Sequence, residues 1–128
     1  MNTIKYQGAT VNYRDDKIIH IHYDSVLISL EEAKMLIKNV GEKSPWKVAP
    51  IYISAEPFAN HEPEAQKFLT SDYVMSRSSA VAVLVISIAQ KIGVNLFIKI
   101  RKPSKPTRFF TSEKEAINWL QQFETIDK

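Results

Sequence analysis

A short strand that leads directly into a capped helix is encoded by residues 106–120, which read Pro106-Thr107-Arg108-Phe109-Phe110-Thr111-Ser112-Glu113-Lys114-Glu115-Ala116-Ile117-Asn118-Trp119-Leu120. The aromatic pair Phe109 and Phe110 is typical of a strand. Ser112 and Glu115 have the spacing of a capping box, and apolar residues then recur at the three- and four-residue steps of a helix with one buried face. The stretch therefore predicts one strand-to-helix unit, and similar units precede it along the chain.

The composition predicts one globular domain that spans residues 1–128. The chain has 128 residues, of which 45% are hydrophobic and 24% are charged, and its formal net charge is +3. A chain of this length can bury a hydrophobic core of its own. It contains no cysteine, which excludes disulfide bonds, thiolate nucleophiles and cysteine-based metal sites.

Neither a secretory signal nor a membrane span is expected. Residues 1–17 mix charged and polar groups and contain no apolar core of the kind that a signal peptide needs. The longest apolar run, residues 80–86, is far shorter than the roughly 20 residues that cross a bilayer. We therefore expect a protein without transmembrane segments and with a cytoplasmic location.

The first half of the chain predicts a hairpin, a helix and a strand. Residues 9–13 and 18–23 have the composition of strands, and a polar turn separates them. Ser29 and Glu32 form a second capping box, and Gly41 is expected to end the helix that follows. Residues 47–54 then predict a strand, in which Pro50 indicates an irregular or edge-like start.

The second half predicts a further alternation of helices and strands. Pro63 is expected in the first turn of a second helix, and residues 80–86 form a continuous apolar run that suits a strand buried on both faces of a parallel sheet. Residues 88–102 carry apolar side chains at helical spacing, and two prolines then separate this helix from the final unit. The order ββαβαβαβα predicts an α/β fold in which helices flank a mostly parallel sheet.

This arrangement resembles the STAS and SpoIIAA-like family of small domains. The residues that carry the resemblance are the buried strand 79–87, the helix 88–102, the proline-containing joint, and Arg108-Phe109-Phe110-Thr111 followed by residues 115–120. The resemblance covers nearly the whole chain. It implies a SpoIIAA-like fold and binding to other proteins.

The phosphorylation switch of this family is not implied. In its anti-sigma-factor antagonists a phosphorylatable serine sits in an Asp-Ser-Ser-Gly-like turn after the strand that corresponds to residues 47–54. The matching turn here reads Ser54-Ala55-Glu56-Pro57-Phe58-Ala59-Asn60-His61-Glu62, with no Asp-Ser pair and no glycine.

His20 and His22 are the nearest approach to a metal motif in the sequence. Two residues apart on a strand, they project from the same face. No third ligand lies nearby in the sequence, so we interpret them as a half-exposed strand face and expect no metal and no cofactor.

The loop after residues 47–54 is the predicted contact surface. It gathers Ser54, Glu56, Phe58, Asn60 and His61 at the carboxyl end of a parallel strand, where α/β sheets commonly bind ligands. Catalysis would need a hydrogen bond between a base and a nucleophile, which proximity in sequence does not establish. We therefore expect binding and not an enzyme, while an acid-base site that pairs His61 with Glu56 or Glu62 stays open.

Two weaker surfaces lie further along the chain. Val94 and Ile98 form a second apolar stripe on the helix 88–102, which indicates either a neighbouring helix or the interface of a homodimer. A weak anion contact is predicted for four basic residues, Arg101, Lys102, Lys105 and Arg108. Nucleic-acid binding is not expected, because the aromatic residues beside them suit the core better.

The sequence thus predicts a non-catalytic cytoplasmic module with a regulatory or protein-interaction role and an unknown protein partner. The alternative is a carrier of a small apolar ligand or lipid, with a pocket between the sheet and the helices. A third hypothesis is an acid-base enzyme centred on His61.

Overall fold

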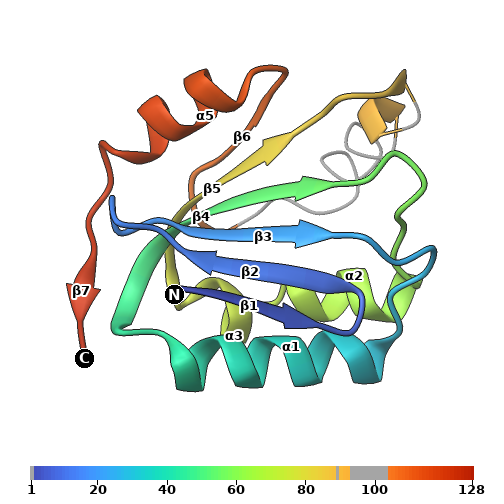
Figure 1. Ribbon diagram of the computed structural model, residues 1–128, viewed down its shortest axis with the longest axis horizontal. Coiled ribbons are helices and arrows are strands. Elements are labelled where there is room, and N and C mark those ends of the chain that lie inside the picture. The colour runs from blue at the N-terminus through green and yellow to red at the C-terminus, as the bar shows by residue number, and fades with distance from the viewer. Residues whose placement is uncertain (1, 89, 93–103) are drawn as a thin grey trace.

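A mixed β-sheet forms the centre of the computed structural model, which describes residues 2–88, 90–92 and 104–128 (Figure 1). Its strands lie in the order β1-β2-β3-β4-β5-β6, and β7 pairs with β4. The described elements are β1 (Thr3–Tyr6), β2 (Ala9–Tyr13), β3 (Ile19–Tyr23), α1 (Leu30–Lys43), β4 (Trp46–Ala55), α2 (Pro63–Leu69), α3 (Asp72–Met75), β5 (Ser78–Leu84), β6 (Thr107–Phe110), α5 (Glu113–Leu120) and β7 (Ile126–Asp127).

The sheet has an antiparallel side and a parallel side. β1, β2 and β3 form an antiparallel meander, and β3, β4, β5 and β6 are parallel. The predicted N-terminal hairpin and parallel sheet are confirmed. Two strands were not predicted. They are β1, in which the exposed Thr3 and Lys5 alternate with the half-buried Ile4 and Tyr6, and β7, which has two residues.

Helix α1 begins as predicted and ends later than predicted. Ser29 and Glu32 form a complete capping box. Gly41 was expected to end the helix, but the helix continues through it to Lys43 and Ser44 caps the end. An added Cβ at Gly41 would lie 2.6 Å from Nη1 of Arg77, which is the far end of a flexible side chain.

The cap of α1 gives a testable stability effect. The Ser29 side chain accepts a hydrogen bond from the Glu32 backbone amide at 3.1 Å. Ser29→Ala leaves that amide without its partner and is expected to lower the free energy of unfolding by about 1 kcal/mol. Urea denaturation measures this, with Ser25→Ala as a control that should change it by less than about 0.5 kcal/mol. Equal effects of the two substitutions would contradict the assigned cap.

The second predicted helix is divided in two. Pro63 occupies the first turn of α2, as predicted, and Thr70 ends that helix. Ser71 then caps α3 by accepting from the Val74 amide. The Ser71 side chain hydrogen-bonds to a nearby backbone amide, and such a bond favours the start of a new helix over continuation of the previous one.

Helices cover both faces of the sheet (Figure 1). On one face, α1 and α2 pack over a core that includes Val11, Ile21 and Leu36. On the other face, α5 packs Leu120 and Ala116 against strand residues of β4 and β5. The predicted final strand and helix are confirmed in β6 and α5, and α5 closes a core of its own.

Pro50 marks an irregularity inside the sheet. It is fully buried, and the register between β4 and β5 shifts between Ala49 and Ile51. The irregular strand start is confirmed, although β4 is not an edge strand, because it lies between β3 and β5. Most of the predicted helix 88–102, including Val94, Ile98, Arg101 and Lys102, lies outside the described residues.

Candidate functional site

A hydrogen-bonded cluster surrounds Ser54 at the carboxyl end of β4. Ser54 is directly opposite His22 in the parallel register of β3 and β4. Its Oγ lies 2.7 Å from Nε2 of His20 and 2.7 Å from Nδ1 of His22. On the far side of the same ring, Nε2 of His22 lies 3.5 Å from Oε2 of Glu56. The four side chains therefore form one chain, Glu56–His22–Ser54–His20.

The positions of the protons on His22, Ser54 and His20 can be assigned from the groups that each of them contacts. A glutamate carboxylate accepts, so Nε2 of His22 carries the proton that faces Glu56, and Nδ1 is left as an acceptor. Ser54 then donates its hydroxyl proton to His22 and accepts from the Nε2 proton of His20. Both contacts of the Ser54 hydroxyl then have one donor and one acceptor.

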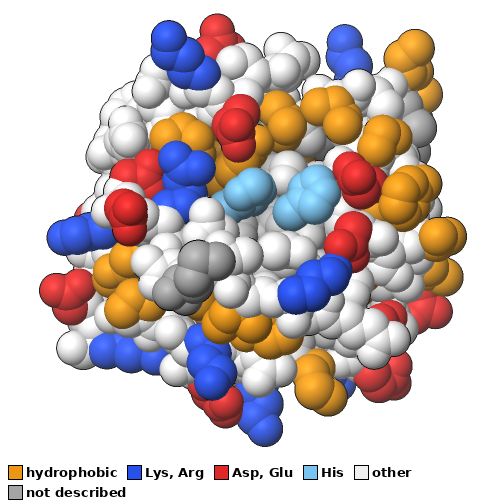
Figure 2. Space-filling view, in the orientation of Figure 1, with side chains coloured by type: hydrophobic (Ala, Val, Ile, Leu, Met, Phe, Trp, Pro, Cys, Tyr) orange, Lys and Arg blue, Asp and Glu red, His pale blue; other side chains and the backbone are white. Residues whose placement is uncertain are grey.

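The cluster lies on the part of the sheet face that α5 leaves uncovered. Histidine side chains are visible there in the middle of the face in Figure 2. The His22 side chain is 34% exposed, whereas Ser54 is only 6% exposed. His20 stacks on Tyr52 with ring centroids 4.5 Å apart. Burial, assisted by the charges of His22 and Arg14, lowers the pKa of His20 to about 4.

His61 does not join this cluster. Its ring packs edge-on against Tyr23 with centroids 4.5 Å apart, and its Nε2 is buried without a hydrogen-bond partner. Burial lowers the pKa of His61 to about 4. Among the described residues no ion pair or hydrogen bond joins its side chain to Glu56 or Glu62. The arrangement required by the acid-base hypothesis is therefore not formed.

Exposed hydrophobic side chains gather where β3, β4 and β5 end. We call this surface the edge patch; its members are Val26, Leu27, Phe58, Ile86, Ile88 and Ile92, which are 49–80% exposed. Figure 2 shows hydrophobic side chains along the right-hand margin, the end toward which the arrows of β3 and β4 point in Figure 1. Large contiguous apolar surfaces of this kind mark interaction sites.

Backbone and side-chain hydrogen bonds hold the segments of the edge patch together. The Ile28 amide donates to the Asn60 carbonyl at 2.8 Å, and the Glu62 amide donates to the Ile28 carbonyl at 2.8 Å. The Gln90 side chain donates to the carbonyls of Ala55 and Glu56 at 3.2 and 3.4 Å. The loops that carry the patch are therefore tied to one another at the sheet edge.

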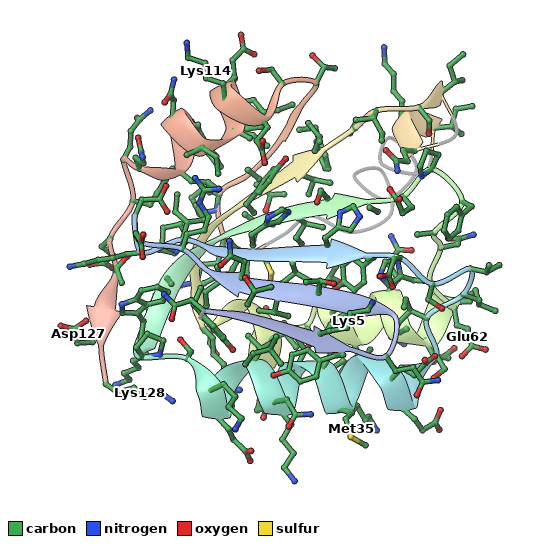
Figure 3. The ribbon with its side chains drawn as sticks, in the orientation of Figure 1. Lys5, Met35, Glu62, Lys114, Asp127 and Lys128 are labelled. Atoms are coloured by element: carbon green, nitrogen blue, oxygen red, sulfur yellow. The ribbon has the colours of Figure 1, made fainter. Side chains whose placement is uncertain are left out.

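The rim of the edge patch is acidic. The segments 24–33 and 55–66 carry six carboxylates and no lysine or arginine: Asp24, Glu31, Glu32, Glu56, Glu62 and Glu64. Three of these lie in the first turns of α1 and α2, where negative charge also stabilises the helix N-terminus. Glu62 lies at this edge in Figure 3. Lys5 pairs with Asp24 and offsets one of the charges.

A large cavity lies on the opposite face of the sheet, beneath α1 to α3. Its volume is about 1250 Å³. Among the described residues, its apolar lining includes Ile37, Ile53, Leu69, Val83 and Phe109. Ser54, Phe58 and Asn60 also line the cavity, whereas His20 and His22 do not.

Sequence comparison decides the family. A family model described as a domain of unknown function, DUF7793, matches residues 12–124. The chain belongs to the DUF7793 family. No curated protein matches it.

Structure comparison supports the same fold as the sequence analysis. This DUF7793 chain is similar to the crystal structure of an uncharacterized protein of the DUF3478 family, with a SpoIIAA-like fold, from Shewanella loihica PV-4. The TM-score is 0.56 at 12% identity, and the match covers 88% of this chain and 91% of the other. The predicted SpoIIAA-like fold is confirmed.

The predicted site residues of the DUF7793 chain divide between the two surfaces. Ser54 belongs to the hydrogen-bonded cluster, and Glu56 lies at ion-pair distance from His22. Phe58 belongs to the edge patch, and the exposed Asn60 holds the loop through its carbonyl. The sequence analysis did not connect His20 and His22 to Ser54. Their shared strand face was visible in the sequence, but the pairing of β3 with β4 that brings them to Ser54 was not.

Arg108 and Lys105 are the described members of the anion contact that was predicted for this DUF7793 chain. Arg108 lies over the rings of Phe110 and Trp119, 5.2 and 5.7 Å from the centroids, and Lys105 is half-buried. Within residues 2–88, 90–92 and 104–128 no group of three or more His, Asp or Glu side chains could hold a metal ion. In the same part of the chain no helix has the length and hydropathy needed to cross a bilayer.

Proposed function

We propose that this protein is a protein-interaction module whose edge patch binds a protein partner. The observation that carries the proposal is the distribution of exposed hydrophobic residues. Of the nine large exposed hydrophobic side chains in the described part of the chain, six belong to the edge patch. A SpoIIAA-like fold, and the protein binding that the STAS resemblance implies, support the same role.

Phe58 is the expected anchor of the interface. Its side chain is 56% exposed and is the only aromatic member of the edge patch among the described residues. Aromatic residues at the centre of a patch commonly contribute most of the binding free energy. Val26 and Leu27 lie on the neighbouring loop, which is joined to the Phe58 loop through Ile28.

The acidic rim favours a protein partner over an anionic membrane. Membrane-binding surfaces carry lysine and arginine beside their apolar residues, because the lipid headgroups are negative. The segments 24–33 and 55–66 of the edge patch have the opposite charge, and Lys91 is the one lysine or arginine in the segment 86–92. A partner with an apolar pocket and lysine or arginine around it complements this surface.

Site-specific photo-crosslinking in the native host tests the proposal. A photoreactive benzoylphenylalanine replaces Leu27 or Phe58 in the edge patch, and Lys114 or Asp127 as controls, which lie away from the patch in Figure 3. We expect one discrete protein adduct from the patch positions and none from the controls, with the crosslinked peptide rich in lysine or arginine. Equal adducts at all positions, adducts to lipid, or a crosslinked pair of identical chains would contradict the proposal.

The cavity supports a second candidate function, the carrier of a small apolar ligand. Its volume of about 1250 Å³ exceeds that of most drug-sized ligand pockets. Native mass spectrometry of the purified protein distinguishes the two functions. A stoichiometric lipid mass that organic solvent removes would favour the carrier, and a bare polypeptide mass would favour the interaction module.

A further inference from the structure

Ser54 has the surroundings of an activated nucleophile. It is not one of the residues of the edge patch. Its hydroxyl oxygen lies 2.7 Å from an imidazole nitrogen on each side, Nδ1 of His22 and Nε2 of His20. On the far side of the His22 ring, Nε2 lies 3.5 Å from Oε2 of Glu56, which is within ion-pair distance. A nucleophile bonded to a base that a third group orients is the geometry of covalent catalysis, on whatever fold it occurs.

We propose that Ser54 accepts an acyl group from a small ester or thioester, with His22 as its base and Glu56 as the group that orients His22. This goes beyond the partner binding proposed above. It assigns chemistry to four residues that no linear motif connects, and it gives the uncovered sheet face a role separate from the edge patch.

The protein, the ester or thioester and water supply every group that the reaction needs. The Ser54 Oγ bonds to the carbonyl carbon while its proton passes to Nδ1 of His22. The bond from that carbon to the leaving oxygen or sulfur then breaks, and the proton on His22 passes to the departing alkoxide or thiolate. In the second half, water bonds to the carbonyl carbon of the acyl-serine and gives a proton to His22. The bond between that carbon and Ser54 Oγ then breaks, the proton on His22 returns to Oγ, and the carboxylic acid is released.

His20 supplies the donor for the negative oxygen that forms in this reaction. Its Nε2 lies 2.7 Å from Ser54 Oγ, so it can donate to an oxygen bound to the same carbon as Oγ. A neutral imidazole can serve as such an electrophile. The burial of His20 against Tyr52 keeps that ring neutral at pH 7.

The environment of Ser54 restricts the substrate to small or flat acyl groups. Ser54 is 6% exposed, and the open approach is beside His22, which is 34% exposed. The main contacts of α5 are with β4, β5 and β6, and the His22 side chain on β3 is partly exposed beside them. A substrate therefore reaches Oγ from the β2–β3 side of the sheet.

Labelling with a fluorophosphonate probe tests the proposal on the full chain. This probe bonds to activated serines with loss of fluoride, and intact-mass and peptide mass spectrometry locate the adduct. We expect one adduct on Ser54 in the wild type, none in Ser54→Ala, and at least about tenfold slower labelling in His22→Gln. Ser25→Ala is the matched control and should label at the wild-type rate.

Two further measurements keep the proposal falsifiable if a variant is unstable. Circular dichroism of each variant shows whether it is folded, and Glu56→Asp should recover part of the labelling rate that Glu56→Ala loses, as expected of a positioning residue. Wild-type protein that stays unlabelled while folded would overturn the proposal. Labelling that persists in folded Ser54→Ala would overturn it as well.

Discussion

Replacing Leu120 with alanine is expected to lower the free energy of unfolding by about 3–4 kcal/mol. Leu120 is 0% exposed and lies in the core between α5 and the sheet, together with Tyr52, Ala80 and Ala82. Two of its neighbours in the strands, Ala80 and Ala82, have short side chains that cannot move to fill the space that the substitution opens. The cost is therefore at the upper part of the range for leucine-to-alanine changes.

Urea denaturation monitored by circular dichroism measures this loss. Met35→Ala is the matched control, because Met35 is 64% exposed and projects away from α1 into solvent in Figure 3. It should change the free energy of unfolding by less than about 0.5 kcal/mol. A loss below about 1 kcal/mol for Leu120→Ala would show that α5 does not close a core on this face of the sheet.

Stability is expected to fall as the pH is lowered from about 6.5 to 4. Burial lowers the pKa of both His20 and His61 to about 4 in the folded protein, against a value near 6.5 in the unfolded chain. Between these values the unfolded state binds protons that the folded state does not bind, so protons favour unfolding. With allowance for partial exposure, the two histidines together should lower the free energy of unfolding by about 3 kcal/mol.

His61→Phe separates the contribution of one histidine. The phenyl ring keeps the aromatic contact with Tyr23 and removes the buried Nε2 that has no partner. We expect a free energy of unfolding at pH 7 equal to or above that of the wild type, and about half of the wild-type loss by pH 4. Denaturation curves at pH 7, 5.5 and 4 measure both. The same steep loss in His61→Phe as in the wild type would contradict the assigned burial of His61.

The local elements could be predicted because their signals are contained in short stretches. The capping box of Ser29, the side-chain cap of Ser112 and the Pro63 start of α2 depend only on neighbouring residues. The prediction that Gly41 ends α1 was wrong, because a glycine that ends a helix and a glycine inside a helix look alike in sequence.

The candidate site was less predictable, because it depends on which strands become neighbours. Ser54 was identified as a site residue from its position at a strand end, but His20 and His22 lie more than thirty residues away from it. Only the parallel register of β3 against β4 brings them together. His61 shows the opposite case: its loop position was predicted, but the inward turn of its ring toward Tyr23 depends on tertiary packing.

The edge patch could be predicted only in part, because its exposed residues also depend on tertiary contacts. Phe58 was predicted as a contact residue, whereas Val26 and Leu27 follow β3 and gave no signal that separated them from core residues. Ile28, two residues after Val26, is 2% exposed, while Val26 is 72% exposed. The hydrogen bonds from Ile28 to the loop of residues 60–62 decide which side of the segment faces solvent.

The most direct test of the proposed interaction is the affinity of the partner that crosslinks to the edge patch. Isothermal titration calorimetry compares its binding to the wild type, Phe58→Asp and Met35→Asp. Phe58→Asp should weaken binding by at least about 100-fold, as expected for an aromatic anchor, while Met35→Asp leaves it unchanged and added salt weakens the wild-type complex. Equal affinity of Phe58→Asp and the wild type would contradict the edge patch as the binding surface.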